Sequence, residues 1–234
     1  MSMTERVARA YGVLRGVGME RYPAQYYGLD LGKTNDYSAL TVLRAATHSG
    51  GIPILRSERT FTIGHLRRFP LRTKYVDIVE SVGKLIRADR GKMSDVFLVV
   101  ERNAVGEGVL EMFELAGLEP WGIFSTPGNQ VTKGEGVRQW NVPKRDLVSA
   151  ADVAMQTGRL KIGPGLKFTK ELRDELANFT VKFTALGHDS YEAQKSGEHD
   201  DIVMSVALAV WAARTAYVDA DGPVWGPNPT QFRR

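Results

Sequence analysis

The run VFLVV at residues 96–100 constrains the fold more than any other stretch of this 234-residue chain. Its apolar residues follow one another without polar alternation, which is typical of a central strand covered on both faces. Apolar residues recur at helical spacing between Lys74 and Ala88, so a helix is predicted shortly before this strand. The two elements together predict an α/β domain in which helices pack against a sheet.

The remaining pattern predicts a mixed five-stranded sheet flanked by helices, with an added β-hairpin before the C-terminal helix. Residues 26–31 and 39–46 are predicted to pair, because the Gly, Asn and Asp of the intervening GKTND favour a turn. Residues 126–140 are predicted to be a mobile, Gly-rich loop. The other expected elements are strands at 54–62 and 120–125, helices at 105–117, 143–157, 170–178 and 201–217, and the hairpin at 181–194.

This pattern also predicts the domain organisation. Residues 1–23 are expected to be an Arg-rich N-terminal extension, and residues 24–217 to form the folded domain. Residues 218–234 contain Pro223, Pro227 and Pro229 and are expected to be a disordered tail.

Composition excludes several kinds of site. The chain has no cysteine, which rules out disulfides, zinc–thiolate centres and cysteine nucleophiles. Its net charge of +4 mildly favours a polyanionic partner. The first residues lack the apolar core of a secretory signal, and the longest apolar run, residues 202–213, is shorter than the roughly 20 residues that span a bilayer. We therefore expect an intracellular protein with no membrane partner.

The GKT at residues 32–34 resembles a phosphate-binding loop but has the wrong spacing. A P-loop requires a glycine five positions before the GK, and that position is Tyr27. Actin-like and heat-shock ATPases have a first phosphate motif similar to GLDLGKTN, but their fold requires a second lobe with an Asp-Gly-Gly loop, which this sequence lacks. We therefore expect no ATP hydrolysis.

Four carboxylates fall at positions that call for an explanation. Asp30 lies between two leucines of a predicted strand, where a charge is costly unless it is paired, hydrogen-bonded or bound to metal. Glu101 ends the VFLVV strand, and residues at matching heights of neighbouring strands lie about 4.8 Å apart, close enough to share a divalent ion. Asp200 and Asp201 open an apolar helix, and consecutive helical residues point about 100° apart. One of them is expected to face the sheet, and the other to cap the helix or reach a second ion.

Each acid also has an ordinary interpretation as a turn, strand-end or helix-cap residue. Together, and with no basic partner expected among them, the acids would repel one another unless divalent cations neutralised them. Two ions about 3.5 to 4 Å apart support phosphodiester hydrolysis, because one activates a water and the other stabilises the leaving oxygen. The cluster therefore predicts a metal-dependent hydrolase.

Three segments resemble, in order and spacing, the C-terminal nuclease domain of phage terminase large subunits. They are GLDLGKTNDYSALTVL, FLVVERNAVGEGVLEMF and YEAQKSGEHDDIVMSVALAVWA, and the resemblance covers residues 24–215. It implies an RNase H-like fold whose acids bind two Mg²⁺ or Mn²⁺ ions and cut double-stranded DNA during genome packaging. By position, Asp30 and Glu101 match the first two acids of the family, and Asp200 or Asp201 matches the last.

The resemblance also implies a setting and partners. These are the host cytoplasm, a packaging ATPase domain, a portal and a small terminase subunit. Because this chain has no room for the ATPase, it is expected to be either an excised nuclease domain or the product of a gene for the nuclease alone. Two alternatives remain open: another RNase H-like nuclease such as a Holliday-junction resolvase, and a non-catalytic DNA-binding or capsid-docking module.

Several other side chains are candidates for supporting roles. His199 could orient a water or ligate an ion, or it could be an exposed residue ahead of the helix. Trp121, Trp140 and Trp211 are expected to pack in the core rather than to stack on bases. Basic residues are expected to hold DNA phosphates, with ordinary solvated surface as the alternative for each. The candidates are Lys33, Arg67, Arg68, Arg72, Lys74, Lys133, Arg138, Lys144, Arg145 and Lys182.

Overall fold

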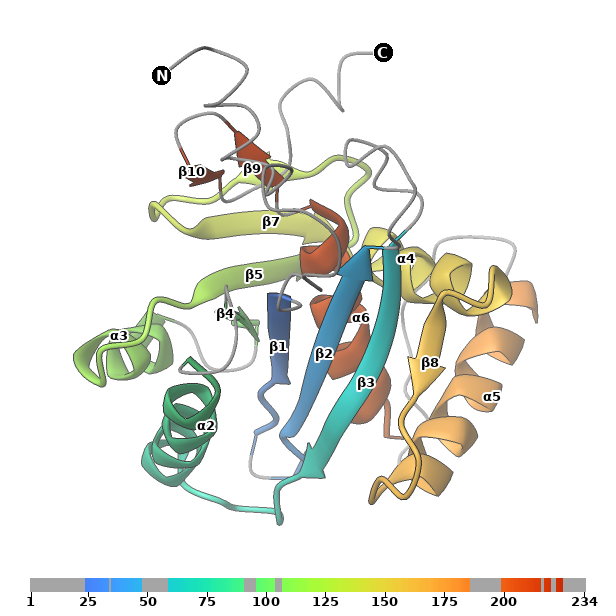
Figure 1. Ribbon diagram of the computed structural model, residues 1–234, viewed down its shortest axis with the longest axis horizontal. Coiled ribbons are helices and arrows are strands. Elements are labelled where there is room, and N and C mark those ends of the chain that lie inside the picture. Colours follow the sequence, from blue (N-terminus) through green and yellow to red (C-terminus); the bar gives the residue numbers. More distant parts are fainter. Residues whose placement is uncertain are drawn as a thin grey trace, which may run out of the picture.

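The computed structural model consists of one large mixed sheet with helices on both faces (Figure 1). It describes residues 24–33, 35–47, 59–90, 96–103, 107–185, 199–215, 217–219 and 222–224. The expected N-terminal extension, residues 1–23, lies outside this part of the chain. None of the helices described combines the length and the apolar character needed to cross a membrane.

Within the described residues, eight strands form the sheet, in the order β6-β7-β5-β4-β1-β2-β3-β8. The strand β1 pairs in parallel with β4 and antiparallel with β2, so the sheet is mixed as expected. The prediction of five strands was wrong because β6, β7 and β8 have only two, five and three residues and show too little alternation to be recognised. The strands are Ala24–Asp30 (β1), Ala39–Thr47 (β2), Arg59–Arg68 (β3), Val96–Glu101 (β4), Trp121–Thr126 (β5), Thr132–Lys133 (β6), Gln139–Pro143 (β7) and Leu160–Ile162 (β8).

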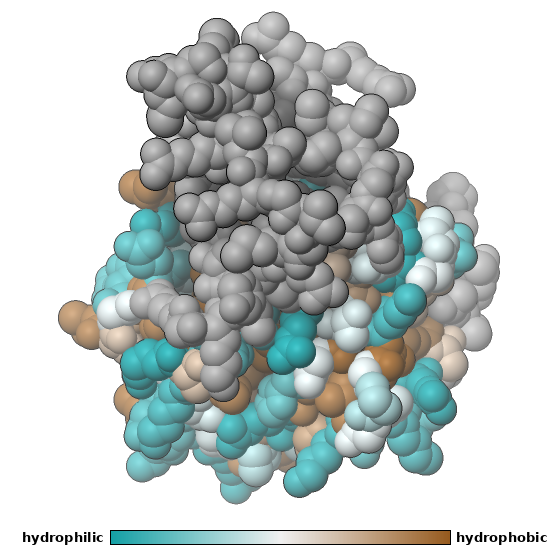
Figure 2. All heavy atoms as spheres, viewed as in Figure 1, coloured by the Kyte–Doolittle hydropathy of each residue, from teal (hydrophilic) through white to brown (hydrophobic). Residues whose placement is uncertain are grey.

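The helices divide between two apolar layers. Tyr75–Arg90 (α2) and Glu107–Leu115 (α3) pack on one face of the sheet. Lys144–Gln156 (α4), Thr169–Ala185 (α5) and Asp201–Thr215 (α6) pack on the other. On the visible face, the surface at the lower left, around α2 and α3, is mainly hydrophilic, as expected of helices with one apolar side (Figure 2).

Close packing of α6 on β1 brings the predicted acids together. Every residue of α6 from Asp201 to Ala213 is buried, as its continuous apolar sequence requires. Gly28 of β1 permits the contact, since a Cβ atom there would lie 2.1 Å from the carbonyl oxygen of Ser205 and 2.7 Å from the backbone nitrogen of Ala209. The glycine therefore allows α6 to pack directly on β1, which brings the start of α6 close to the end of β1.

Three local predictions differ from the structure. Residues 181–185, predicted as the start of the hairpin, continue α5, because extending a helix adds one hydrogen bond per residue and outweighs the strand preference of VKFT. The rest of that hairpin, residues 186–198, lies outside the described residues. The predicted loop at 126–140 contains β6 and the start of β7. Across the start of the predicted tail, residues 218–234, Tyr217–Asp219 (β9) and Gly222–Val224 (β10) form an antiparallel pair, since proline is tolerated in an edge strand.

Candidate active site

The ends of β1 and β4 place Asp30 beside Glu101. The parallel register of the two strands runs to Leu29 opposite Val100, so these acids are the next residues along neighbouring strands. Leu29 and Val100 are fully buried, whereas both acids are only partly buried. The two strands are therefore neighbours, which is the condition for Asp30 and Glu101 to share an ion.

The start of α6 brings Asp200 and Asp201 to the same place. The carbonyl of Asp200 accepts a 2.8 Å hydrogen bond from the amide of Met204, so Asp200 holds the N-cap position, and Asp201 is the first helical residue. Burial raises the pKa of Asp30 well above its ordinary value, and the charge of Glu101, a hydrogen bond with it, and the charges of Asp200 and Asp201 raise it further. All four predicted acids thus lie within one electrostatic cluster.

Lys144 supplies a positive charge on the Asp200 side of this cluster. Its Nζ atom lies 3.1 Å from Oδ2 of Asp200. Burial lowers the pKa of Lys144, but the charges of Asp200, Glu101 and Asp30 raise it above its ordinary value. The ammonium group therefore lies in the field of three acids. The expectation of a cluster without a basic partner was wrong, because α4 delivers this lysine from a distant part of the sequence.

Glu101 is held by two polar residues that the sequence did not single out. The hydroxyl of Ser125, on β5, donates to a carboxylate oxygen of Glu101. Asn103 in turn accepts a 2.8 Å hydrogen bond from the Ser125 amide and donates to its carbonyl and hydroxyl oxygens at 2.7 and 2.8 Å. These contacts fix the orientation of Glu101. A serine and an asparagine 22 residues apart leave no recognisable signal in one sequence.

Asp201 has a second and more buried partner, Arg68, at the end of β3. The Nε of Arg68 donates to Oδ2 of Asp201 at 2.7 Å and its terminal nitrogen to Oδ1 at 3.2 Å. The same guanidinium contacts Glu175 of α5, which also accepts a 2.9 Å hydrogen bond from the amide of Val203. Burial raises the pKa of Asp201, and it raises that of Glu175 to about 7, while Arg68 opposes both shifts. Arg68, expected to contact DNA, is instead engaged inside the protein.

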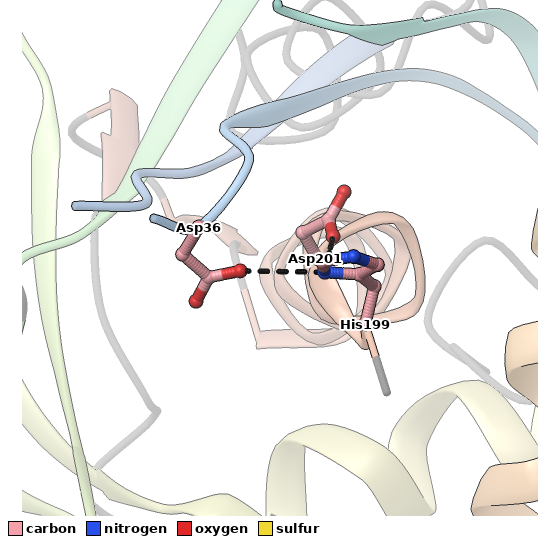
Figure 3. A group of neighbouring side chains, drawn as sticks. All are labelled: Asp36, His199 and Asp201. Carbon is pink, nitrogen blue, oxygen red and sulfur yellow. Dashed lines mark ion pairs between the residues drawn. The ribbon is translucent and has the colours of Figure 1, made fainter. Parts of the chain in front are cut away.

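A further group of possible ligands consists of Asp36, His199 and Asp201. Figure 3 shows the imidazole of His199 between the two carboxylates. Its Nδ1 lies 3.7 Å from Oδ1 of Asp36 and 4.0 Å from Oδ1 of Asp201. One ligand atom from each residue lies within 4.8 Å of the others, an arrangement that could hold a metal ion. The sequence prediction missed Asp36, which lies in the turn after β1 and looked like an ordinary turn former.

Comparison with known proteins places this arrangement in context. No family model matches the chain. The terminase large subunits of Thermus phage G20c and Thermus virus P23-45 are each 31% identical to it over 182 residues, which is 78% of this chain and 30% of each relative. The human cytomegalovirus terminase nuclease domain, soaked with Mn and bound to an inhibitor, matches with a TM-score of 0.51 at 15% identity, covering 90% of this chain and 94% of that one.

The chain is similar to terminase large subunits, and its fold is that of a terminase nuclease domain. The resemblance stated from the sequence and the RNase H-like α/β fold that it implied are thereby confirmed. The chain spans 30% of the length of the terminase large subunits it matches.

In this terminase-like fold, the basic residues predicted to hold phosphates divide into two groups. Lys33, Arg72 and Lys74 are exposed around the turn after β1 and the β3–α2 connection. Most of the others contact protein groups. Arg67 donates a hydrogen bond to Ser81 and lies over the ring of Phe69, and Lys133 lies over the ring of Trp140. Arg138 forms an ion pair with Glu119, and Arg145 contacts Asp146 and the carbonyl of Asn129. The side chain of Lys182 lies outside the described part of α5.

Three tryptophans of the terminase-like fold, Trp121, Trp140 and Trp211, pack in or against the core. Trp121 and Trp211 are buried, so the prediction that they pack rather than stack on bases is confirmed for both. Trp140 is partly buried and packs against the core cluster on the α6 side of the sheet.

Proposed function

We propose that the chain is a metal-dependent endonuclease that cuts double-stranded viral DNA during genome packaging. The observation that carries the proposal is the convergence of Asp30, Glu101, Asp200 and Asp201 from two adjacent strand ends and one helix start. Such a cluster of carboxylates binds hard divalent cations such as Mg²⁺ and Mn²⁺. The names of the relatives, terminase large subunit and terminase nuclease domain, agree with this chemistry.

We infer that the donor set holds two divalent ions. Asp30, Glu101 and Asp200 would hold one ion, and the ammonium of Lys144 in their field indicates that this group of oxygens attracts a cation. Asp36, His199 and Asp201 would hold the other. Because Asp200 and Asp201 are consecutive, the start of α6 joins the two groups. When bound, such ions activate a water and stabilise the leaving oxygen of a phosphodiester.

The other residues of the site would position these ligands. Ser125 and Asn103 orient Glu101 through their hydrogen bonds, and Arg68 fixes Asp201. Exposed basic residues would hold backbone phosphates, so cleavage is expected to be largely independent of DNA sequence and to weaken as salt rises. We propose the host cytoplasm as the setting, and a packaging ATPase domain, a portal and a small terminase subunit as partners.

Cleavage of supercoiled plasmid by the full chain, with and without Mn²⁺, tests the proposal. We expect nicking and linearisation with Mn²⁺, no cleavage in EDTA, and nearly complete loss of cleavage in Asp30→Asn. The matched control is Asp152→Asn, which makes the same change of charge on the outer side of α4, where Asp152 bonds only Gln156 among the contacts described. Equal cleavage by the parent and Asp30→Asn would show that the acids are not the active site.

The same preparation tests the nearest alternatives. A parent that cuts four-way junctions but spares linear duplex would favour a junction resolvase over a packaging nuclease. A parent that binds duplex but cleaves no DNA with any divalent ion would favour a non-catalytic DNA-binding module.

A further inference from the structure

A pocket of about 300 Å³ lies next to the candidate metal ligands. Its walls are the turn after β1 and the connection from β3 to α2, two segments that are far apart in the sequence. Asp36 lines the pocket and also belongs to the group with His199 and Asp201. A ligand in the pocket would therefore lie beside that group.

The pocket carries an excess of positive charge. Lys33, Arg72 and Lys74 all line it and are all exposed, whereas Asp36 is the one acid among its described lining residues. Three cations against one carboxylate favour an anionic ligand. The mixture of a guanidinium and two ammonium groups suits phosphate oxygens, which accept several charge-assisted hydrogen bonds.

Hydrogen bonds hold the two walls in a fixed relation. The hydroxyl of Tyr75 donates to the Gly32 carbonyl at 3.0 Å, and the amide of Phe69, at the start of the β3–α2 connection, donates to the Ser38 carbonyl at 2.8 Å. A Cβ atom on Gly32 would lie 2.3 Å from the carbonyl oxygen of Tyr37, so only glycine fits at this position of the turn after β1. The pocket is therefore formed before a ligand arrives, as is usual for binding sites.

Arg72 occupies a backbone conformation that an arginine rarely adopts. It lies in a turn in which the amide and hydroxyl of Thr73 donate to the carbonyl of Pro70 at 3.2 and 2.6 Å, and its φ is 64°. Gly or Asn adopts this conformation more readily. A strained residue in a ligand-facing turn indicates a use for its side chain, and here that side chain lines the basic pocket.

We propose that this pocket is a phosphate-binding subsite that holds a backbone phosphate of bound DNA beside the candidate metal centre. The inference rests on the proposed function and adds the position at which the backbone of the DNA strand is bound. A phosphate in the pocket fixes the register of the strand relative to Asp36 without reading its sequence.

Binding of a labelled DNA duplex to the full chain in EDTA, followed by fluorescence anisotropy over a range of salt concentrations, tests the subsite. Arg72→Asn removes the charge but suits the turn, so it should melt at or above the parent temperature. It should weaken binding several-fold and lower the slope of log K against log salt by about one. Arg72→Lys keeps the charge and should retain most of the affinity and slope.

Two further variants keep the result interpretable. Lys74→Gln leaves the strained turn unchanged and should lower the salt slope by a similar amount, about one. Lys84→Gln makes the same change of net charge on the exposed surface of α2, where Lys84 pairs with Glu80, and should bind like the parent. If Arg72→Asn and Lys74→Gln both bind like Lys84→Gln, the pocket is not a phosphate subsite.

Because DNA binding is measured without divalent ions, loss of the phosphate subsite can be distinguished from loss of nuclease activity. A parent that never cuts plasmid but loses affinity through Arg72→Asn would keep the subsite and reject the nuclease. A parent whose cleavage depends on Asp30, but whose DNA binding is unaffected by Arg72→Asn and Lys74→Gln, would keep the nuclease and reject the subsite.

Discussion

Asp200 and Asp201 are adjacent in the chain yet have different surroundings. The Asp200 carboxylate meets the ammonium of Lys144, and the two side chains remain 24% and 30% exposed. The Asp201 carboxylate is 1% exposed and meets the guanidinium of Arg68 in two hydrogen bonds, and that guanidinium also contacts the buried Glu175. Water therefore reaches the first pair more readily than the second, which lies between β3, α5 and α6.

This difference indicates two kinds of ion pair within one site. An ammonium–carboxylate pair that solvent can reach is held weakly, so another cation, including a metal ion, can replace the ammonium. A buried, bidentate arginine pair has lost its hydration, so breaking it leaves a charge without compensation. We therefore regard the Asp200 side as the exchangeable half of the site and the Asp201 side as its fixed frame.

The largest expected effect comes from the fixed frame. Arg68→Met leaves Asp201 and Glu175 without their shared cation, and we expect it to lower the free energy of unfolding by about 3 kcal/mol. Urea unfolding in EDTA, with Lys84→Met as an exposed control, measures the loss. A loss below about 1 kcal/mol would put this pair in the class of weak surface pairs and remove the contrast between the two sides.

The pH dependence of stability probes the same frame. Burial raises the pKa of Glu175 from 4.5 to about 7, so the folded chain holds a proton on Glu175 that the unfolded chain releases near pH 4.5. The stabilisation from this proton is complete below about pH 4.5 and is lost as the pH rises through about 7. Relative to Glu175→Gln, the parent should therefore lose roughly 2 kcal/mol of unfolding free energy between pH 5 and 8. Parallel stability profiles for the two proteins would contradict a buried, proton-holding Glu175.

A smaller effect is expected on the exchangeable side. Lys144→Met removes the ammonium from the field of Asp30, Glu101 and Asp200, so the metal-free melting temperature should fall by a few degrees as the acids repel one another. Millimolar Mn²⁺ should restore it by binding only the folded state, whereas Arg68→Met should not be rescued in this way. Thermal melts with and without Mn²⁺ measure both variants. Equal rescue of the two, or rescue of neither, would show that the two sides do not differ as described.

The sequence allowed the four acids to be predicted because each occupies an unusual position. A charge between two leucines, a glutamate ending an apolar run and two aspartates before a fully apolar helix are all visible without a structure. The order of the main strands and helices could also be predicted, because long apolar runs indicate buried segments.

The partners of those acids could not be predicted. Arg68 and Asp201 are 133 residues apart, and Arg68 looks like a surface cation at the end of an amphipathic strand. Lys144 and Asp200 are 56 residues apart, and Asp36 looks like an ordinary turn residue. Such contacts depend on how the helices pack on the sheet, and the local sequence pattern does not indicate that packing. The short strands β6 and β8 were missed because two or three residues show no period.

The central claim is that these acids form a centre for two divalent ions, and the number of Mn²⁺ ions bound per chain tests it most directly. Titration of the full chain followed by calorimetry should give two ions for the parent and for Asp152→Asn. Asp200→Asn should lose at least one ion while keeping the parental melting temperature in EDTA, because its side chain lies on the exchangeable side. Two ions bound equally by the parent and Asp200→Asn, or no saturable binding by the parent, would contradict the account.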